Sequence, residues 1–401
     1  MNKGLAAILG LLALVMGVGA VVALRDQAAP TTPAGQSKLG QPLLPQLKAA
    51  EVARIIIREP KATITLEKKN DRWVINERGG FPADLDKVTE LVVKAIELKT
   101  GQTESIGEKD RARMQLLAPP AASSAAPASA EGTATSVVFS GTDGKTLAEL
   151  WLGQKYFKTA PEGDTAKAPG DGRFVMLPAD QARVVVVADP MKQATAKAGD
   201  WIAREGFVVE NIKSIEVKLP DGGYRVSRAI MDTPWELDGL AAKPAKPAPA
   251  PKGGGASTGA ALDQSRASGA SYALAKLDLE DVAAAGVDAG FDNGSEIIAS
   301  TFDGLEYRIK VGRLDGTRYF AQFAVQGELS RPAPSAPPNE KPEDKDKREK
   351  AFAEQTKTLN ARIAREKALG PFTLMIAKAK FDDVLKTRAA LLAQDQKDAK
   401  K

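Results

Sequence analysis

The sequence predicts an α+β fold: an N-terminal transmembrane helix followed by two tandem, related domains, each an antiparallel sheet with covering helices. A strand–turn–strand pattern that leads to a tryptophan-bearing third strand occurs at residues 54–75 and again, about 160 residues later, at 213–237. An amphipathic helix follows the first pattern, and a long apolar stretch opens the chain. The repetition indicates two copies of one domain.

The strands of both patterns are recognised by short β-rich runs that are separated by turn residues. They are expected at 54–58, 63–67 and 70–75 in the first copy, and at 213–218, 224–227 and 233–237 in the second. Two later hairpins, at 136–153 and 296–312, both turn on Asp-Gly, which is strong hairpin chemistry. The repeat therefore extends beyond its first strands.

Helices are expected where apolar residues recur at three- and four-residue steps. Pro82-Ala83-Asp84 opens the clearest one, with Asp84 as its N-cap and apolar positions running to Leu98. Further helices are predicted at 192–203, 272–277, 279–285, 352–368 and 381–392, and a strand is predicted at 372–376.

Changes of composition divide the chain into an anchor, a tether, two domains and a tail. The divisions are the anchor at 1–25, the flexible tether at 26–49, the first domain at 50–200, the second domain at 201–392 and the charged tail at 393–401. The first domain has an Ala/Pro/Ser-rich insertion at about 118–134, and the second has insertions at about 241–260 and 329–348.

Residues 4–24 are uncharged and mostly apolar, and as a helix they match a hydrocarbon core of roughly 30 Å. Lys3 precedes them, which favours an inside amino terminus and places the rest of the chain outside the cytoplasm. Val21-Val22-Ala23 offers a cleavage site, so a cleaved signal peptide is the alternative, and a buried soluble helix is a second one.

The composition excludes many functions. The 401 residues contain no His and no Cys, so imidazole- or thiolate-based nucleophile systems and zinc sites with those ligands cannot form. The net charge of +5 is small against 107 charged residues, so nucleic acid is not expected as a partner. No catalytic residue, cofactor or metal ligand is assigned.

The remaining candidates for chemistry are weak. Three carboxylate groups could pair or hold a cation, but helix capping explains them better: Asp84/Asp86, Asp278/Glu280/Asp281 and Asp382/Asp383. The tryptophans Trp73, Trp151, Trp201 and Trp235 could form a stacking platform, but packing is the better interpretation. Gly144-Lys145-Thr146 resembles the end of a phosphate-binding loop, but a hairpin turn is the better interpretation. Asn293-Gly294-Ser295 matches a glycosylation triplet, but an Asn-Gly turn explains it as well.

The order of these features resembles a bacterial family known as the domain-of-unknown-function 4340 family (DUF4340). The resemblance rests on the anchor, residues 70–75, Pro82-Ala83-Asp84, Trp201 before the second strand pattern, and Gly370-Pro371-Phe372, and it covers about 50–392. It implies a membrane-anchored extracytoplasmic protein, often encoded beside transport systems similar to the ABC-type machinery linked to gliding motility. It brings no catalytic residues.

The expected function is that of a non-enzymatic accessory or scaffold protein of the bacterial inner membrane. Residues 4–24 would anchor it in a single pass, and its periplasmic or external domains would bind a membrane complex such as ABC-type transport components. Two alternatives remain open: a carboxylate- or cation-dependent hydrolase of envelope polymer, and a ligand-binding module that uses an inter-domain cleft.

Overall fold

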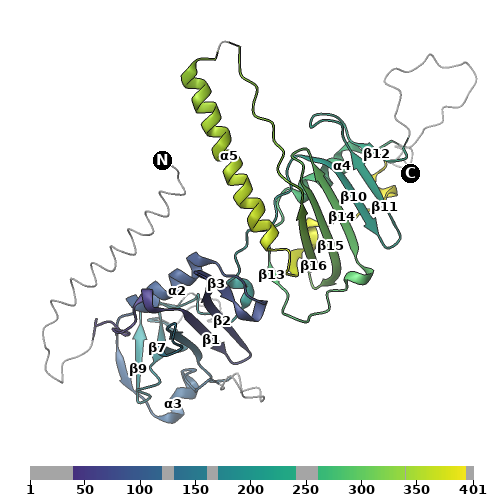
Figure 1. Ribbon diagram of the computed structural model, residues 1–401. Helices are drawn as coiled ribbons and strands as arrows, with labels where there is room; N and C mark the ends of the chain where they lie inside the picture. The colour runs from purple at the N-terminus through teal and green to yellow at the C-terminus, as the bar shows by residue number, and fades with distance from the viewer. Residues whose placement is uncertain (1–38, 120–130, 160–169, 241–260, 339, 394–401) are drawn as a thin grey trace, which may run out of the picture.

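The computed structural model describes residues 39–119, 131–159, 170–240, 261–338 and 340–393. These residues form two antiparallel sheets, of nine and eight strands, and four α-helices (Figure 1), which confirms the α+β prediction. The predicted anchor at 4–24 lies outside the described residues. Among the residues that are described, no helix is both long and apolar enough to cross a membrane.

The first sheet has the strand order β4-β3-β2-β1-β6-β7-β8-β9-β5. Its strands are β1 (Arg54–Glu59), β2 (Ala62–Lys69), β3 (Arg72–Ile75), β4 (Phe81–Pro82), β5 (Thr103–Ser105), β6 (Thr135–Ser140), β7 (Thr146–Tyr156), β8 (Gly172–Met176) and β9 (Arg183–Val187). Helix α2 (Leu85–Glu97) packs Val88, Leu91 and Ala95 into the core, and α3 (Glu108–Arg113) is short.

The second sheet has the order β12-β11-β10-β14-β15-β16-β17-β13. Its strands are β10 (Ile212–Leu219), β11 (Gly222–Ser227), β12 (Glu236–Leu237), β13 (Asp281–Val282), β14 (Ser295–Thr301), β15 (Glu306–Asp315), β16 (Arg318–Gln326) and β17 (Leu374–Ala377). Helix α4 (Gln264–Leu274) follows β12, and α5 (Pro342–Ala368) lies between β16 and β17.

The two sheets share one strand order, because eight strands of the first match the eight of the second and α2 and α4 occupy equivalent places in the chain. The register matches as well. Ile57 of β1 pairs with Ile64 on one side and Val137 on the other. The residues paired in this way in the second sheet, each 160 positions later, are Val217, Tyr224 and Ile297.

The linker between the sheets, residues 188–211, is a ribbon of chain that hydrogen-bonds to both of them. Next to β4, the Trp201 carbonyl accepts from the Asp84 N–H at 2.7 Å. Further along, the Leu277 N–H donates to the Phe207 carbonyl at 2.9 Å, close to β13. Trp201 is 1 % exposed and belongs to a core shared by both sheets. The two sheets are therefore held by packing and backbone hydrogen bonds, and not by a loose connection.

Helix α5 differs from the expectation. It is predicted at 352–368, after an insertion at about 329–348, but it begins at Pro342 and has 27 residues, about 40 Å of helix. Figure 1 shows it projecting from the second sheet together with the segment that leads into it. Arg348 fixes the far end by donating to the Glu340 carboxylate at 2.7 and 2.8 Å and to the Pro334 carbonyl. Among residues 341–350 only Arg348 is partly buried, so its contacts join the exposed first turns of α5 to the segment before the helix.

Other helix predictions were wrong. Residues 192–203 contain only a 3-10 turn at Ala198–Asp200, and 381–392 contain only one at Ala389–Leu391. Helix α4 lies before 272–277 for most of its length, and 279–285 includes the short strand β13 instead of a helix. In each case apolar residues at helical spacing pack through loops and a strand, because tertiary contacts outweigh weak local preference.

Gly206 provides a test of the linker. A Cβ at this position would overlap the Leu277 carbonyl oxygen. We expect Gly206→Ala to lower the free energy of unfolding by about 2 to 3 kcal/mol, because the ribbon must shift. Gly107→Ala is the matched control, since Gly107 has φ −81° and its nearest neighbour to a Cβ is 3.8 Å away. Urea unfolding of both variants makes the comparison, and equal stabilities would contradict a tightly packed linker.

Candidate functional site

The Asp84/Asp86 group caps a helix, as the sequence predicts. The Asp84 carboxylate accepts from the Asp86 and Lys87 N–H groups at 3.1 and 3.3 Å. Lys87 in turn donates from its ammonium group to the Asp200 carbonyl of the linker at 2.5 Å. The start of α2 therefore fixes both its own first turn and the segment that joins the two sheets.

The Asp278/Glu280/Asp281 group does not begin a helix, so capping is the wrong interpretation here. Asp281 lies in β13 of the second unit, which is the second sheet with its helices, and Arg78 lies in the first unit, which is the first sheet with α2 and α3. Arg78 donates to the Asp281 carboxylate twice, from Nε to Oδ1 at 3.0 Å and from Nη2 to Oδ2 at 3.2 Å. Both side chains are largely buried. Asp278 contacts Lys276 at 3.5 Å on the surface. The group thus contributes an ion pair between the two units.

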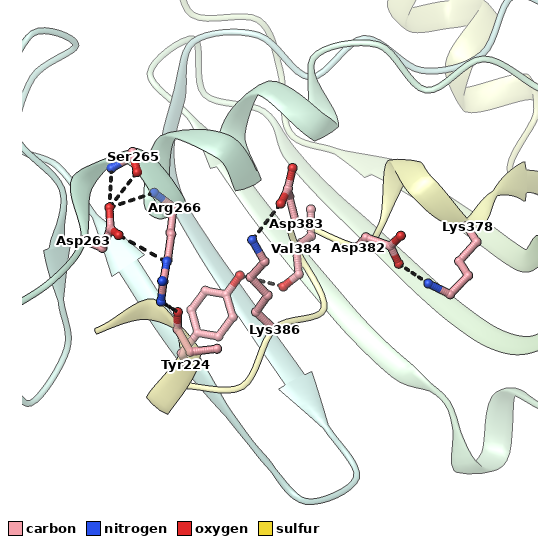
Figure 2. Close-up of polar contacts among 10 residues, drawn as sticks. Tyr224, Asp263, Ser265, Arg266, Lys378, Asp382, Asp383, Val384 and Lys386 are labelled. Carbon is pink, nitrogen blue, oxygen red and sulfur yellow. Dashed lines mark hydrogen bonds and ion pairs between the residues drawn. The ribbon is translucent and has the colours of Figure 1, made fainter. Parts of the chain in front are cut away.

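Asp382 and Asp383 also lie outside any helix. Figure 2 shows that each carboxylate faces its own lysine, Asp382 towards Lys378 at 2.6 Å and Asp383 towards Lys386 at 2.7 Å. The two carboxylates are therefore neutralised separately and do not form an acid–base pair of the kind that hydrolysis of a glycosidic bond requires.

The segment that carries these aspartates is held against the second sheet by polar contacts (Figure 2). The Tyr224 hydroxyl of β11 donates to the Val384 carbonyl at 2.7 Å, and burial raises the pKa of this phenol well above its usual value. Arg266 of α4 donates to the Ala390 and Leu392 carbonyls. The sequence predicts a closing helix at 381–392. This segment, which we call the closing strap, is instead mostly irregular, and the side chains of Tyr224 and Arg266 donate to its backbone carbonyls.

Glu366, near the end of α5, is the most buried charged side chain among the described residues, at 0 % exposed. Its carboxylate accepts from the Tyr307 hydroxyl at 3.0 Å and from the Val208 N–H at 3.1 Å, and Arg362 Nε lies 3.8 Å away. Burial raises the pKa of Glu366, although these partners oppose the shift. The group joins the base of α5 to β15 and to the linker.

Sequence reasoning missed Glu366, although a signal was present. It shares one helix face with Leu359 and Ile363, seven and three residues earlier, and Ile363 is buried. A carboxylate on an apolar face is unusual enough to mark a buried polar contact.

The remaining candidates have structural roles. Trp151, Trp201 and Trp235 are buried, as packing predicts, and Trp73 is half-buried. Gly144-Lys145-Thr146 lies in the β6–β7 hairpin, and Asn293 ends a 3-10 turn before β14. The described residues contain no cluster of three or more His, Cys, Asp or Glu side chains that could hold a metal ion.

An open depression of about 420 Å³ lies beside the β10–β11 hairpin. Two glycines shape it, Gly222 and Gly223, and its rim carries Lys218 and Arg225. The Lys218 ammonium group contacts Glu296 at 2.9 Å, and Arg225 lies 3.9 Å from Asp238. Both cations are thus paired with carboxylates of the same chain. The depression is therefore a solvated face of the sheet whose charges are already paired.

The Arg78–Asp281 contact is testable with a double-mutant cycle. We expect Arg78→Ala and Asp281→Ala to be coupled by about 1 to 3 kcal/mol, because the pair is largely buried and doubly hydrogen-bonded. The control is the exposed pair Lys48–Glu51, for which coupling below about 1 kcal/mol is expected. Chemical denaturation of the four variants of each cycle gives both values. Similar coupling in the two cycles would contradict a role for Arg78 in joining the units.

The raised pKa of Glu366 predicts a specific pH dependence. Between pH 4.5 and the higher folded-state pKa, the unfolded chain releases the proton that the folded chain keeps, so stability falls as pH rises. Relative to Glu366→Gln, the wild type should therefore gain stability when the pH is lowered from 8 to 5. Urea unfolding at both pH values measures this, with the exposed Glu343→Gln as control. If the difference in unfolding free energy between the wild type and Glu366→Gln is the same at both pH values, the pKa of Glu366 is not raised.

Comparison with known proteins gives one match. The family model described as "Domain of unknown function (DUF4340)" matches residues 73–294, more than half of the chain, and this range contains the whole linker. No curated protein and no solved structure matches. The chain therefore belongs to the DUF4340 family, as its sequence features predicted.

Proposed function

We propose that this chain is a non-enzymatic accessory or scaffold protein, anchored in the bacterial inner membrane by residues 4–24, with residues 50–392 outside the cytoplasm. The observation that carries the proposal is the linker ribbon. Backbone hydrogen bonds and the buried Trp201 fix two sheets that share an eight-strand order in one body, which would hold binding surfaces at constant separation.

A duplicated domain suits this function. We attribute the shared strand order and the 160-residue register to duplication of one ancestral unit, because independent origin of eight strands in one order is improbable. Two linked copies offer two surfaces, and linking raises the effective concentration of the second contact once the first is made.

The partner that we favour is a membrane complex such as ABC-type transport components. The basis is the resemblance of the chain to proteins encoded beside such systems, together with the anchor, which would confine the chain to the surface where these complexes lie. Helix α5 supports the proposal because it is a rigid projection whose far end is fixed by Arg348 and whose base is fixed by Glu366.

Removal of residues 2–25 tests the anchoring. We expect the full chain to sediment with membranes and to resist extraction by carbonate, and the truncated chain to be recovered in the soluble fraction. Protease added to spheroplasts should digest the full chain, because the domains lie outside. Recovery of the full chain in the soluble fraction, or protection from protease until the membrane is opened, would contradict the proposal.

The scaffold and hydrolase functions predict different outcomes for the carboxylates. If the chain acts by binding, Asp278→Asn and Glu280→Gln should leave a cell phenotype unchanged, because Asp278 only meets Lys276 at the surface. Growth and envelope integrity of cells with the double variant measure this, after thermal unfolding confirms the fold. Loss of function in a folded double variant would favour the hydrolase.

A further inference from the structure

The loop between β11 and β12 presents two bulky apolar side chains to solvent. Ile230 is 61 % exposed and Met231 is 46 % exposed, and Ala229 beside them is also exposed. We call residues 229–231 the apolar tip. Single exposed apolar residues are common, whereas contiguous exposed apolar surface marks interaction sites, and Ile230 and Met231 are adjacent.

The first unit provides an internal comparison. Its equivalent connection, between β2 and β3, is the tight turn Asn70-Asp71, with φ of 49° and 62°, and it is wholly polar. Leu66 pairs with Ile75 in the first unit, and Val226 pairs with Leu237 in the second, so the chain between the matched pairs is two residues longer in the second unit. The first unit thus closes this hairpin with a polar turn, and it has no counterpart of the apolar tip.

The apolar tip is held in one conformation. The Thr233 hydroxyl donates to the Ile230 carbonyl at 2.8 Å and accepts from the Ile230 N–H at 3.2 Å. Arg228 donates to the Met231 carbonyl at 2.6 Å, and its guanidinium group lies 4.5 Å from the centre of the Trp235 ring. A preorganised loop loses little conformational entropy when it binds, so this arrangement favours recognition.

The charges of the loop indicate the kind of partner. Arg228 is engaged by Trp235 and by two carbonyls, whereas Asp232 and Glu236 are exposed. Exposed carboxylates in this loop and at the start of β12 disfavour insertion into an anionic lipid surface, because they are repelled by it and lose hydration. They suit a protein pocket that is apolar at its base and basic at its rim.

We propose that Ile230 and Met231 are the anchor residues by which this chain docks into an apolar, basic-rimmed pocket of a partner protein. This inference rests on the proposed scaffold function and specifies where the scaffold holds its partner. Because two buried anchors dominate a small interface, their loss should weaken the complex strongly without unfolding either sheet.

The test is site-specific photocrosslinking of the full chain in intact cells of its host. A diazirine-bearing amino acid replaces Ile230 in one strain and Asn70, the equivalent turn of the first unit, in a second strain. We expect one protein adduct from position 230 and none from position 70. Met231→Asp in the same chain should reduce that adduct at least about tenfold, while the thermal unfolding temperature stays unchanged.

Several outcomes overturn the inference: an adduct with lipid, an adduct with a second copy of this chain, no adduct from position 230, or equal adducts from both positions. The two proposals fail separately. If the chain sediments with membranes and co-purifies with a partner but position 230 gives no adduct, the docking site is wrong and the scaffold function stands. If the chain does not associate with membranes, the anchored scaffold is wrong whatever position 230 contacts.

Discussion

The arrangement of this molecule depends on the linker that crosses between its sheets. The Trp201 indole N–H donates to the Thr195 carbonyl at 2.8 Å, and the ring fills the core at the junction. Beyond it, the Leu279 N–H donates to the Arg204 carbonyl at 3.2 Å, so the ribbon pairs with the segment that leads into β13. Rotation of one sheet against the other would break these bonds and expose the tryptophan, which makes a hinge at this point costly.

The two units share their strands and differ in their connections. In the first unit, six residues between β8 and β9, 177–182, complete the turn, whereas 47 residues separate β16 from β17 in the second and include α5. The apolar tip is likewise an addition of the second unit. Common strands provide stability, and unequal connections provide surfaces that only one copy has. The first unit has additions of its own, such as α3 between β5 and β6, so each unit has surfaces that the other lacks.

Local patterns predicted the elements that are determined locally. Strand alternation located β1 and β10, Asp-Gly located the β6–β7 and β14–β15 hairpins, and the Asp84 cap located α2. Long-range contacts could not be predicted, because nothing in the neighbourhood of Arg78 indicates a partner 203 residues away in Asp281. The prediction of a closing helix at 381–392 was wrong for the same reason. The apolar residues there have helical spacing, but hydrogen bonds from Tyr224 and Arg266 hold the segment in another conformation.

The family match spans the junction between the two sheets. It begins at Trp73 in β3 and ends at Gly294 before β14, so it includes the linker, Arg78, Asp281 and the loop with the apolar tip, whereas α5 lies beyond it. The junction therefore lies within the part of the chain that the family model matches. Helix α5 contacts the junction through Glu366, whose carboxylate accepts from the Val208 N–H of the linker. Because a buried carboxylate is stable only when its partners are in place, the orientation of α5 is tied to that of the junction. A force or a partner acting on the projecting helix would therefore act on both sheets together.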